Sequence, residues 1–236
     1  MGVLLSVDWD FFFPVPSSEE DKEFLYDWGH NEDNKKIDGT LWTIRAATFI
    51  RNGKELPGTS GKETSFWGRF RIGSKAKLFL ADSHASIVSD YITRHYFNSV
   101  ISFDAHHDAS YERPINNLKF TCEDWVHYFL QRKIKVKVVY PQWKKDHAFE
   151  EEPEAPLELE RVVDDGDPLP YNISSIFICR SGTWVPSWLD NQFNKLISGC
   201  PVGKRILVGS LEKRTFSLAE AAKFSNLEAK LLEEKP

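Results

Sequence analysis

The chain alternates between short apolar runs and longer segments with a helical pattern. The mostly apolar runs occupy residues 3–7, 77–81, 100–103, 136–140, 176–179 and 205–208. Apolar runs of this length, bounded by turn formers, predict buried strands, and runs without polar alternation predict the central strands of a parallel sheet. The run 136–140 alternates with lysine, so we expect that strand nearer the sheet edge.

Helices are expected between these runs. We predict them over residues 87–97, over 122–132, up to about residue 197, and over 218–232. The alternation of strand and helix predicts an α/β fold, with a mostly parallel sheet between helices on both faces, which gives three α/β/α layers. A length of 236 residues suits a single domain spanning 1–236.

Two stretches interrupt the alternation. Residues 14–73 are rich in Pro, Gly, Ser and charge, so we expect a loop-rich elaboration, with short helical and extended pieces, over the strand ends. Residues 142–172 are acidic and Pro-rich, so we expect an insertion that is mobile apart from an edge hairpin near 157–163.

Composition narrows the functional classes. A net charge of −5 gives no electrostatic reason to expect a nucleic acid partner. The three cysteines match no zinc spacing, and scattered cysteines of this kind fit a reducing cytosol. Neither a signal peptide nor a membrane-spanning run is visible in the sequence. We therefore expect a cytoplasmic protein. Eight Trp and 17 Phe are enough for an aromatic-lined cleft as well as a core.

Acidic and histidine residues gather where predicted strands end. Asp104, His106 and Asp108 follow one strand at a spacing that places them on one face of an extended chain, and Asp8 and Asp10 follow another. His84 lies at a strand-to-helix junction; alone it would more often be structural. These side chains converge at one edge of the sheet if the three strands are parallel neighbours.

Such a cluster is costly to bury unless a positive charge lies within it. Carboxylates with a minority of imidazoles suit Mn²⁺ better than Zn²⁺. The alternative to a metal site is a set of solvated turns that are rich in Asp and His. Four carboxylates and two imidazoles suffice for two divalent ions. Two close ions activate one water and stabilise an anionic tetrahedral intermediate.

The three motifs resemble those of the ureohydrolase family, the arginases and agmatinases. Residues 104–108, Asp-Ala-His-His-Asp, are similar to its Asp-Ala-His-x-Asp motif; residues 82–86, Asp-Ser-His-Ala-Ser, to its Gly-Gly-Asp-His-Ser motif; and residues 6–10, Ser-Val-Asp-Trp-Asp, to its Ser-x-Asp-x-Asp motif. The last motif comes first here, so the chain resembles a rewired, divergent arginase. The divergent group includes the peptide arginases, which convert arginine to ornithine in ribosomally made precursor peptides.

The resemblance implies the arginase/deacetylase-like fold, with a rewired strand order, and two Mn²⁺ ions. It implies that one ion is held by His84, Asp104, Asp108 and Asp8, and the other by His106, Asp104, Asp8 and Asp10. Asp108 would also hold the attacking hydroxide.

Some residues of the site have weaker counterparts in the family. His127 is the candidate proton shuttle, although the gap before it is longer than in arginases. Asp27, His30 and Trp184 are candidates for contacting substrate, and Asp27 or Asp190 could supply the guanidinium-binding carboxylate that arginases carry at a later strand end. Asp27 and His30 are otherwise turn formers and caps.

The leading hypothesis is therefore a Mn²⁺-dependent hydrolase of the arginine guanidinium that releases urea and leaves ornithine. The aromatic content favours an arginine-containing precursor peptide over free arginine. A metal-dependent amidohydrolase or deacetylase of a small molecule is one alternative. A metal-stabilised binding module without turnover is the other.

Overall fold

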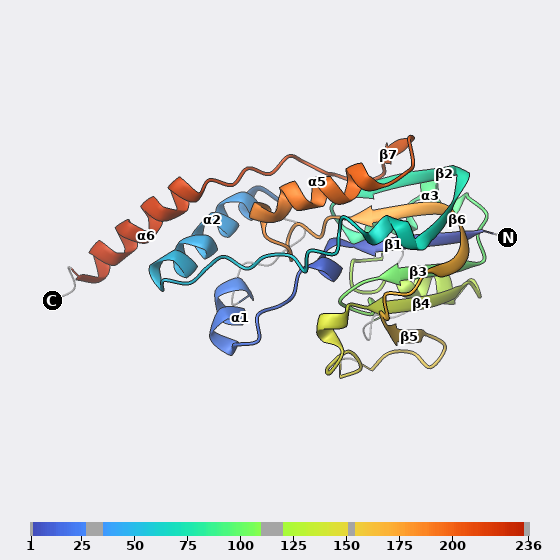
Figure 1. The fold of residues 1–236 in the computed structure, drawn as a ribbon, viewed down its shortest axis with the longest axis horizontal. Helices are drawn as coiled ribbons and strands as arrows, with labels where there is room; N and C mark the ends of the chain where they lie inside the picture. The colour runs from blue at the N-terminus through green and yellow to red at the C-terminus, as the bar shows by residue number, and fades with distance from the viewer. Residues whose placement is uncertain (1, 27–34, 110–119, 151–153, 234–236) are drawn as a thin grey trace.

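The computed structural model describes the chain apart from residues 1, 27–34, 110–119, 151–153 and 234–236 (Figure 1). Its centre is a seven-stranded sheet in which all neighbouring strands are parallel. The strands are β1 (Val3–Asp8), β2 (Phe70–Ala81), β3 (Ser99–Phe103), β4 (Lys135–Tyr140), β5 (Glu160–Val163), β6 (Leu169–Cys179) and β7 (Arg205–Leu207). Each apolar run of the sequence overlaps one of these strands, which confirms the α/β class.

The strand order is β5-β4-β3-β1-β6-β2-β7, with β1 in the middle. Leu5 of β1 lies opposite Ile101 of β3 on one side and opposite Ile176 of β6 on the other. The prediction that the strands before Asp8, His84 and Asp104 are direct neighbours is wrong for β2, because β6 lies between β1 and β2. All three strands still point the same way, so their carboxyl ends open to one edge of the sheet.

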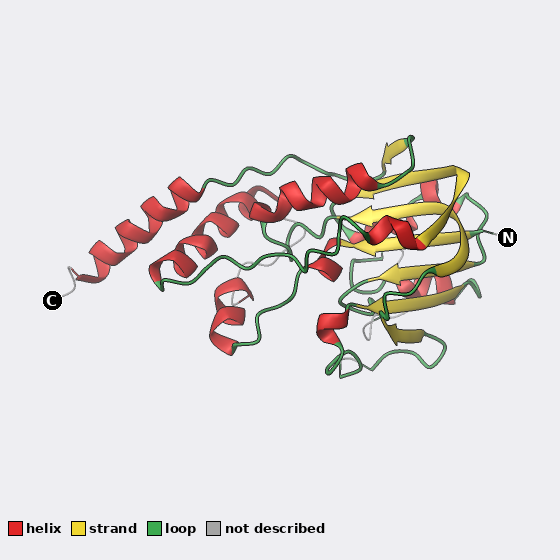
Figure 2. Ribbon diagram, in the orientation of Figure 1, coloured by secondary structure: helices red, strands yellow, loops and turns green. Residues whose placement is uncertain are grey.

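The helices are α1 (Glu19–Tyr26), α2 (Lys35–Arg51), α3 (Asp90–Thr93), α4 (Val126–Leu130), α5 (Asp190–Gly199) and α6 (Leu218–Glu233) (Figure 2). Two hydrophobic clusters pack on the sheet. Leu5 and Val7 of β1 belong to one cluster with Phe193 of α5, whereas Leu4 belongs to the other with Phe129 of α4. Because neighbouring β1 residues point to opposite faces, both faces of the sheet carry helical residues.

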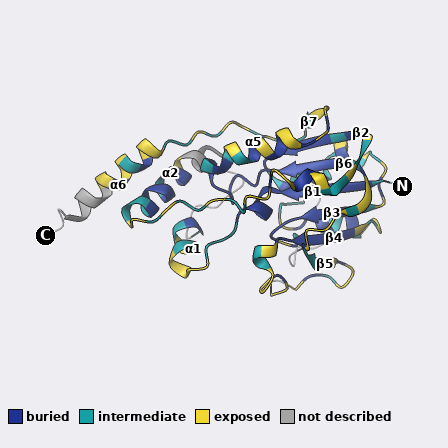
Figure 3. Ribbon diagram, in the orientation of Figure 1, coloured by how far each residue is buried: buried dark blue, intermediate teal, exposed yellow. Residues whose placement is uncertain are grey.

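Helices α1, α2 and α6 lie beyond the carboxyl ends of the strands, and α2 and α6 pack side by side (Figure 1). The 17-residue α2 is longer than the short pieces predicted for residues 14–73. Its buried residues include Leu41, Thr43, Ala47 and Phe49, which point to several sides of the helix and do not form one apolar stripe. Burial on several sides explains why helical periodicity is hard to read there (Figure 3).

Two predicted helices are shorter in the structure. The helix predicted over 87–97 is a 3₁₀ turn, η3 (His84–Val88), followed by the single turn of α3, because Ser89 adopts an extended conformation with ψ 150°. The helix predicted over 122–132 is reduced to α4, and Lys133 follows in the left-handed region at φ 58°. Within the described residues, no helix has the length and apolar character needed to cross a bilayer.

The acidic stretch 142–172 also differs from its prediction. Instead of an edge hairpin, β5 forms a single edge strand parallel to β4, with Val139 opposite Val162. Ala155 and Leu159, which precede it, are buried in the hydrophobic cluster of α4. The described part of this stretch is therefore a crossover packed on the sheet.

Candidate metal centre

Sharp bends follow two of the strands that carry the acidic motifs. Asp8 is the last residue of β1, and its Oδ1 accepts from the Asp10 backbone N–H over 3.1 Å, at the start of the 3₁₀ turn η1 (Trp9–Phe12). Past β3, the backbone N–H of His106 donates to Asp104 Oδ1 over 2.8 Å. Asp108 lies at φ 46°, a conformation uncommon for residues with a side chain. These bends bring the acidic side chains together over the middle of the sheet.

Four side chains form what we call the inner group. They are Asp8, His84, Asp104 and Asp108. The Nδ1 atom of His84 lies 3.0 Å from Asp8 Oδ2, 3.2 Å from Asp104 Oδ2 and 3.0 Å from Asp108 Oδ2. Only 1% of His84 is exposed, and its Nε2 lies 2.8 Å from Ser6 Oγ. The Ser6 contact occupies one ring nitrogen and leaves Nδ1 facing three carboxylates.

This arrangement fits a bound cation. Among the described residues, neither His84 Nδ1 nor Asp104 Oδ2 has a partner in hydrogen-bond geometry, although both atoms are buried. Burial, and then the charges of Asp108 and Asp10, raise the pKa of Asp104 well above its ordinary value. Even a doubly protonated, positively charged imidazole balances only one of the three facing carboxylates, whereas a divalent ion balances two. Oxygen-rich ligation with one imidazole is also the chemistry that Mn²⁺ accepts.

A second set of ligand atoms, the outer group, comprises Asp10, Asp104 and His106. Their ligand atoms lie within 4.8 Å of one another, as do those of Asp8, His84 and Asp104. His106 Nδ1 lies 2.9 Å from Asp10 Oδ2, and the His106 side chain is 60% exposed. Burial, and then the charge of Asp8, raise the pKa of Asp10 to about 6. Partial desolvation by the surrounding residues lowers the pKa of His106, but the contact with Asp10 outweighs it and raises that pKa to about 10. Asp104 belongs to both groups.

Neighbours that sequence reasoning missed hold the inner group in place. Ser181 Oγ donates to Asp8 Oδ2 over 2.6 Å, and Trp125 Nε1 donates to Asp108 Oδ2 over 2.6 Å. The Trp125 ring also packs on the His84 imidazole, with ring centres 4.5 Å apart. The sequence does carry a signal for Ser6, which contacts His84: its spacing of two residues from Asp8, and of four from Asp10, indicates that it lies near the acidic side chains. Ser181 and Trp125 depend on strand order and loop path, which the sequence does not reveal.

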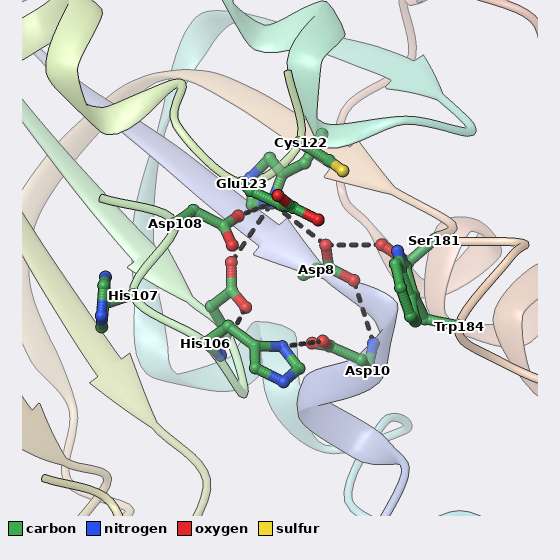
Figure 4. A pocket seen from close by; sticks show the side chains of 11 residues that line it. Asp8, Asp10, His106, His107, Asp108, Cys122, Glu123, Ser181 and Trp184 are labelled. Carbon is green, nitrogen blue, oxygen red and sulfur yellow. Dashed lines mark hydrogen bonds and ion pairs between the residues drawn. The ribbon is translucent and has the colours of Figure 1, made fainter. Parts of the chain in front are cut away.

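The two groups form one wall of a cavity of about 440 Å³ (Figure 4). Trp184, predicted to contact substrate, lies on its wall beside Ser181, and Cys122 and Glu123 were not predicted. His107 also borders the cavity, but Figure 4 shows its ring turned away from the acidic cluster.

The remaining predicted site residues are placed as follows. His127 is not among the described residues that line the cavity, so the structure does not bring the candidate proton shuttle to the metal ligands. Asp190 is paired with Arg214 and lies 3.6 Å from Arg180, and it is not among the described residues that line the cavity. Asp27 and His30 lie outside the described residues.

The structure thus brings together all six residues predicted as metal ligands. The protein is a parallel α/β protein with largely buried groups of Asp and His that could bind a metal. These groups lie at the carboxyl ends of the strands, where such proteins bind ligands. A metal enzyme is the class that this site suggests. Comparison of the chain with models of protein families, with curated proteins and with solved structures finds no match. The likeness to ureohydrolases therefore rests on the three motifs.

Proposed function

We propose that the protein is a Mn²⁺-dependent hydrolase that cleaves the guanidinium of arginine, within a ribosomally made precursor peptide, to ornithine and urea. The observation that carries this proposal is the pair of overlapping Asp/His groups that share Asp104 at the wall of a cavity. When bound there, two divalent ions supply a water of lowered pKa and an electrophilic centre.

The residues of the chain then take three roles. Both groups would hold cations, and Asp104 would contribute to both, since it belongs to both groups, with Oδ2 facing His84 Nδ1 and Oδ1 accepting from the His106 backbone N–H. Asp108 borders the cavity and is held by Trp125, so its free oxygen is available to accept a proton from the attacking water. Trp184 and Glu123, on other parts of the wall, contact substrate.

The charge of the cavity favours a cationic substrate. Five carboxylates line it, from Asp8, Asp10, Asp104, Asp108 and Glu123. Two bound divalent ions would balance four of these charges. The carboxylate of Glu123, on the cavity wall, would recognise a guanidinium, which is planar and suits bidentate recognition by a carboxylate. The ring of Trp184 offers a face for the same cation. A cavity of about 440 Å³ is within the range of small-molecule sites.

A peptide substrate is favoured over free arginine. A free amino acid presents an α-carboxylate, which a selective site would pair with a cation. No lysine or arginine is found among the described residues that line the cavity. In a peptide the α-carboxylate is an amide, so it needs no such partner.

Mass spectrometry of peptide products tests the proposal. Purified protein loaded with Mn²⁺ is incubated with an arginine peptide, the same peptide carrying lysine or Nε-acetyl-lysine instead, and free arginine. We expect urea and a peptide lighter by one CH₂N₂ unit from the arginine peptide alone. The variant Asp104→Asn serves as the inactive control.

Each competing function has its own outcome in the same experiment. Acetate released from the acetyl-lysine peptide would identify an amidohydrolase. Urea released mainly from free arginine would overturn the peptide specificity. Stoichiometric Mn²⁺ binding without any product would indicate a metal-stabilised binding module.

A further inference from the structure

The loop that follows β6 has a conformation that a serine adopts at a cost. Ser181 lies at φ 48°, in the left-handed region that glycine tolerates best. The next residue, Gly182, does not use that region. The chain therefore places a side chain where the backbone alone would favour glycine, which indicates that the Ser181 hydroxyl is needed.

The hydroxyl has a defined target. Ser181 is 4% exposed, and its Oγ donates to Asp8 Oδ2 over 2.6 Å. The other oxygen, Asp8 Oδ1, accepts from the Asp10 backbone. Both oxygens of Asp8 are thus fixed by the protein, and Oδ2 is the one that lies 3.0 Å from His84 Nδ1. Ser181 Oγ also lies 3.3 Å from Cys179 Sγ.

An arginine from the C-terminal part of the chain holds this loop. Arg214 Nη1 donates to the carbonyls of Gly182 and Val185, the latter over 2.9 Å. Its Nε and Nη2 donate to the two oxygens of the Asp190 carboxylate. Its side chain is 6% exposed. Arg214 thus ties together both ends of the segment from Gly182 to Asp190.

A second buried arginine ties the loop to the residue that follows β2 and to the C-terminal part of the chain. Arg180 Nε donates to Asp82 Oδ1 over 2.7 Å, and its Nη1 donates to the Glu212 carbonyl over 2.7 Å. A Cβ on Gly182 would lie 2.6 Å from Asp82 Oδ1 and 3.1 Å from Arg214 Nη1. Glycine is therefore required beside Ser181 because the two ion pairs close tightly around it.

We propose that Ser181 is a positioning residue for the metal ligand Asp8, and that the Arg214–Asp190 pair holds Ser181 in this role. The inference rests on the proposed metal centre and does not depend on which substrate the protein hydrolyses. A hydrogen bond to a ligating carboxylate fixes its rotation and so favours binding of the ion; losing such a partner typically costs about 10- to 100-fold in metal affinity.

The test measures Mn²⁺ affinity, by electron paramagnetic resonance of free Mn²⁺, together with thermal unfolding of the metal-free protein. Ser181→Ala and Ser181→Gly are both expected to weaken the tighter Mn²⁺ site by about 10- to 100-fold. Ser181→Gly should unfold at a temperature no lower than that of Ser181→Ala, because glycine relieves the left-handed conformation.

The matched control is Ser187→Ala. Ser187 is a buried serine within the same segment from Gly182 to Asp190, and its hydroxyl has no hydrogen-bond partner among the described residues. Its removal should leave Mn²⁺ affinity within about twofold of wild type. Arg214→Lys should weaken affinity in the wild-type background and add little in the Ser181→Gly background, as coupled residues do.

Three outcomes would overturn the inference. They are unchanged Mn²⁺ affinity in Ser181→Gly, equal losses in Ser187→Ala and Ser181→Ala, and a wild-type protein that binds no Mn²⁺. A wild-type protein that binds Mn²⁺ in a Ser181-dependent manner but releases no urea would instead overturn only the proposed hydrolysis.

Discussion

The inner and outer groups of the candidate metal centre use the same residue types, but the protein surrounds them differently. In the inner group His84 is 1% exposed and contacts Ser6 through its second nitrogen. In the outer group the His106 side chain is 60% exposed, and its Nδ1 lies 2.9 Å from Asp10 Oδ2. The same ligand chemistry is thus enclosed on one side and open to the cavity on the other.

The difference has consequences for binding. Enclosed ligands with fixed partners lose little freedom when an ion binds, whereas an exposed imidazole must be ordered first. We therefore expect the inner group to hold its ion more tightly and release it more slowly. The outer position, next to the cavity, is where substrate would meet the site. The following predictions test this asymmetry, from the largest expected effect to the smallest.

Asp104→Asn removes the residue common to both groups and so should affect both ions. An amide is neutral and a poor bridging ligand, so we expect urea release below detection and loss of most bound Mn²⁺. His127→Ala, outside the described cavity wall, should reduce activity far less than Asp104→Asn; the general acid–base help of a proton shuttle is typically worth about 10²–10⁴-fold. Near-normal urea release and metal content in Asp104→Asn would contradict the shared role.

The two histidines should separate the groups. His84→Ala is expected to weaken the tighter Mn²⁺ site by more than the about 10- to 100-fold typical of a lost supporting partner, because a ligand itself is removed. His106→Ala should weaken the other site and leave the tighter one near its wild-type affinity. Calorimetric titration with Mn²⁺ resolves the two classes, and the asymmetry fails if both variants lose the same site equally.

Ser6→Ala should produce an intermediate effect. It removes the partner of His84 Nε2, which orients the ring, so we expect the tighter site to weaken by about 10- to 100-fold. Ser102 of β3 lies directly opposite Ser6 in the sheet, is equally buried, and its hydroxyl has no partner among the described residues. Ser102→Ala is therefore the control, and identical losses in the two variants would exclude orientation of the ring by Ser6.

The candidate ligands were predictable because acidic and histidine residues follow recognisable strands, and the carboxyl ends of parallel strands open to one edge of a sheet. The predicted arrangement on one face of an extended chain is wrong past the strand ends, because Asp10 lies in the 3₁₀ turn η1 and the His106 backbone bends back to Asp104. Their supports were not predictable. Ser181 reaches Asp8 because β6 is inserted between β1 and β2, and strand order is set by packing of the whole sheet.

The helical region shows the same limit. Helix α2 was missed because it is buried on several sides, among residues that include a buried arginine, Arg45. A periodic apolar stripe arises only where one side of a helix faces water. The sequence therefore shows the sheet and its chemistry more clearly than the layer beyond the strand ends.

Trp125→Phe should give the smallest effect. Phenylalanine retains most of the ring that packs on His84 but loses the N–H that donates to Asp108 Oδ2 over 2.6 Å. A hydrogen bond to a charged group contributes about 1.5–3 kcal/mol, so the metal-free protein should lose about that much stability. We expect a decrease of up to about tenfold in affinity at the tighter Mn²⁺ site, at the lower end of losses on removing such a partner.

Trp9→Phe separates the hydrogen bond from the loss of volume. Trp9 is also fully buried, and its Nε1 has no hydrogen-bond partner among the described residues. Both substitutions remove the same atoms, so the difference between their free energies of unfolding, measured by urea denaturation, reports the Trp125–Asp108 bond. Equal destabilisation, with Mn²⁺ affinity unchanged in both, would mean that Asp108 is oriented without Trp125 and that the inner group is less fixed than its geometry indicates.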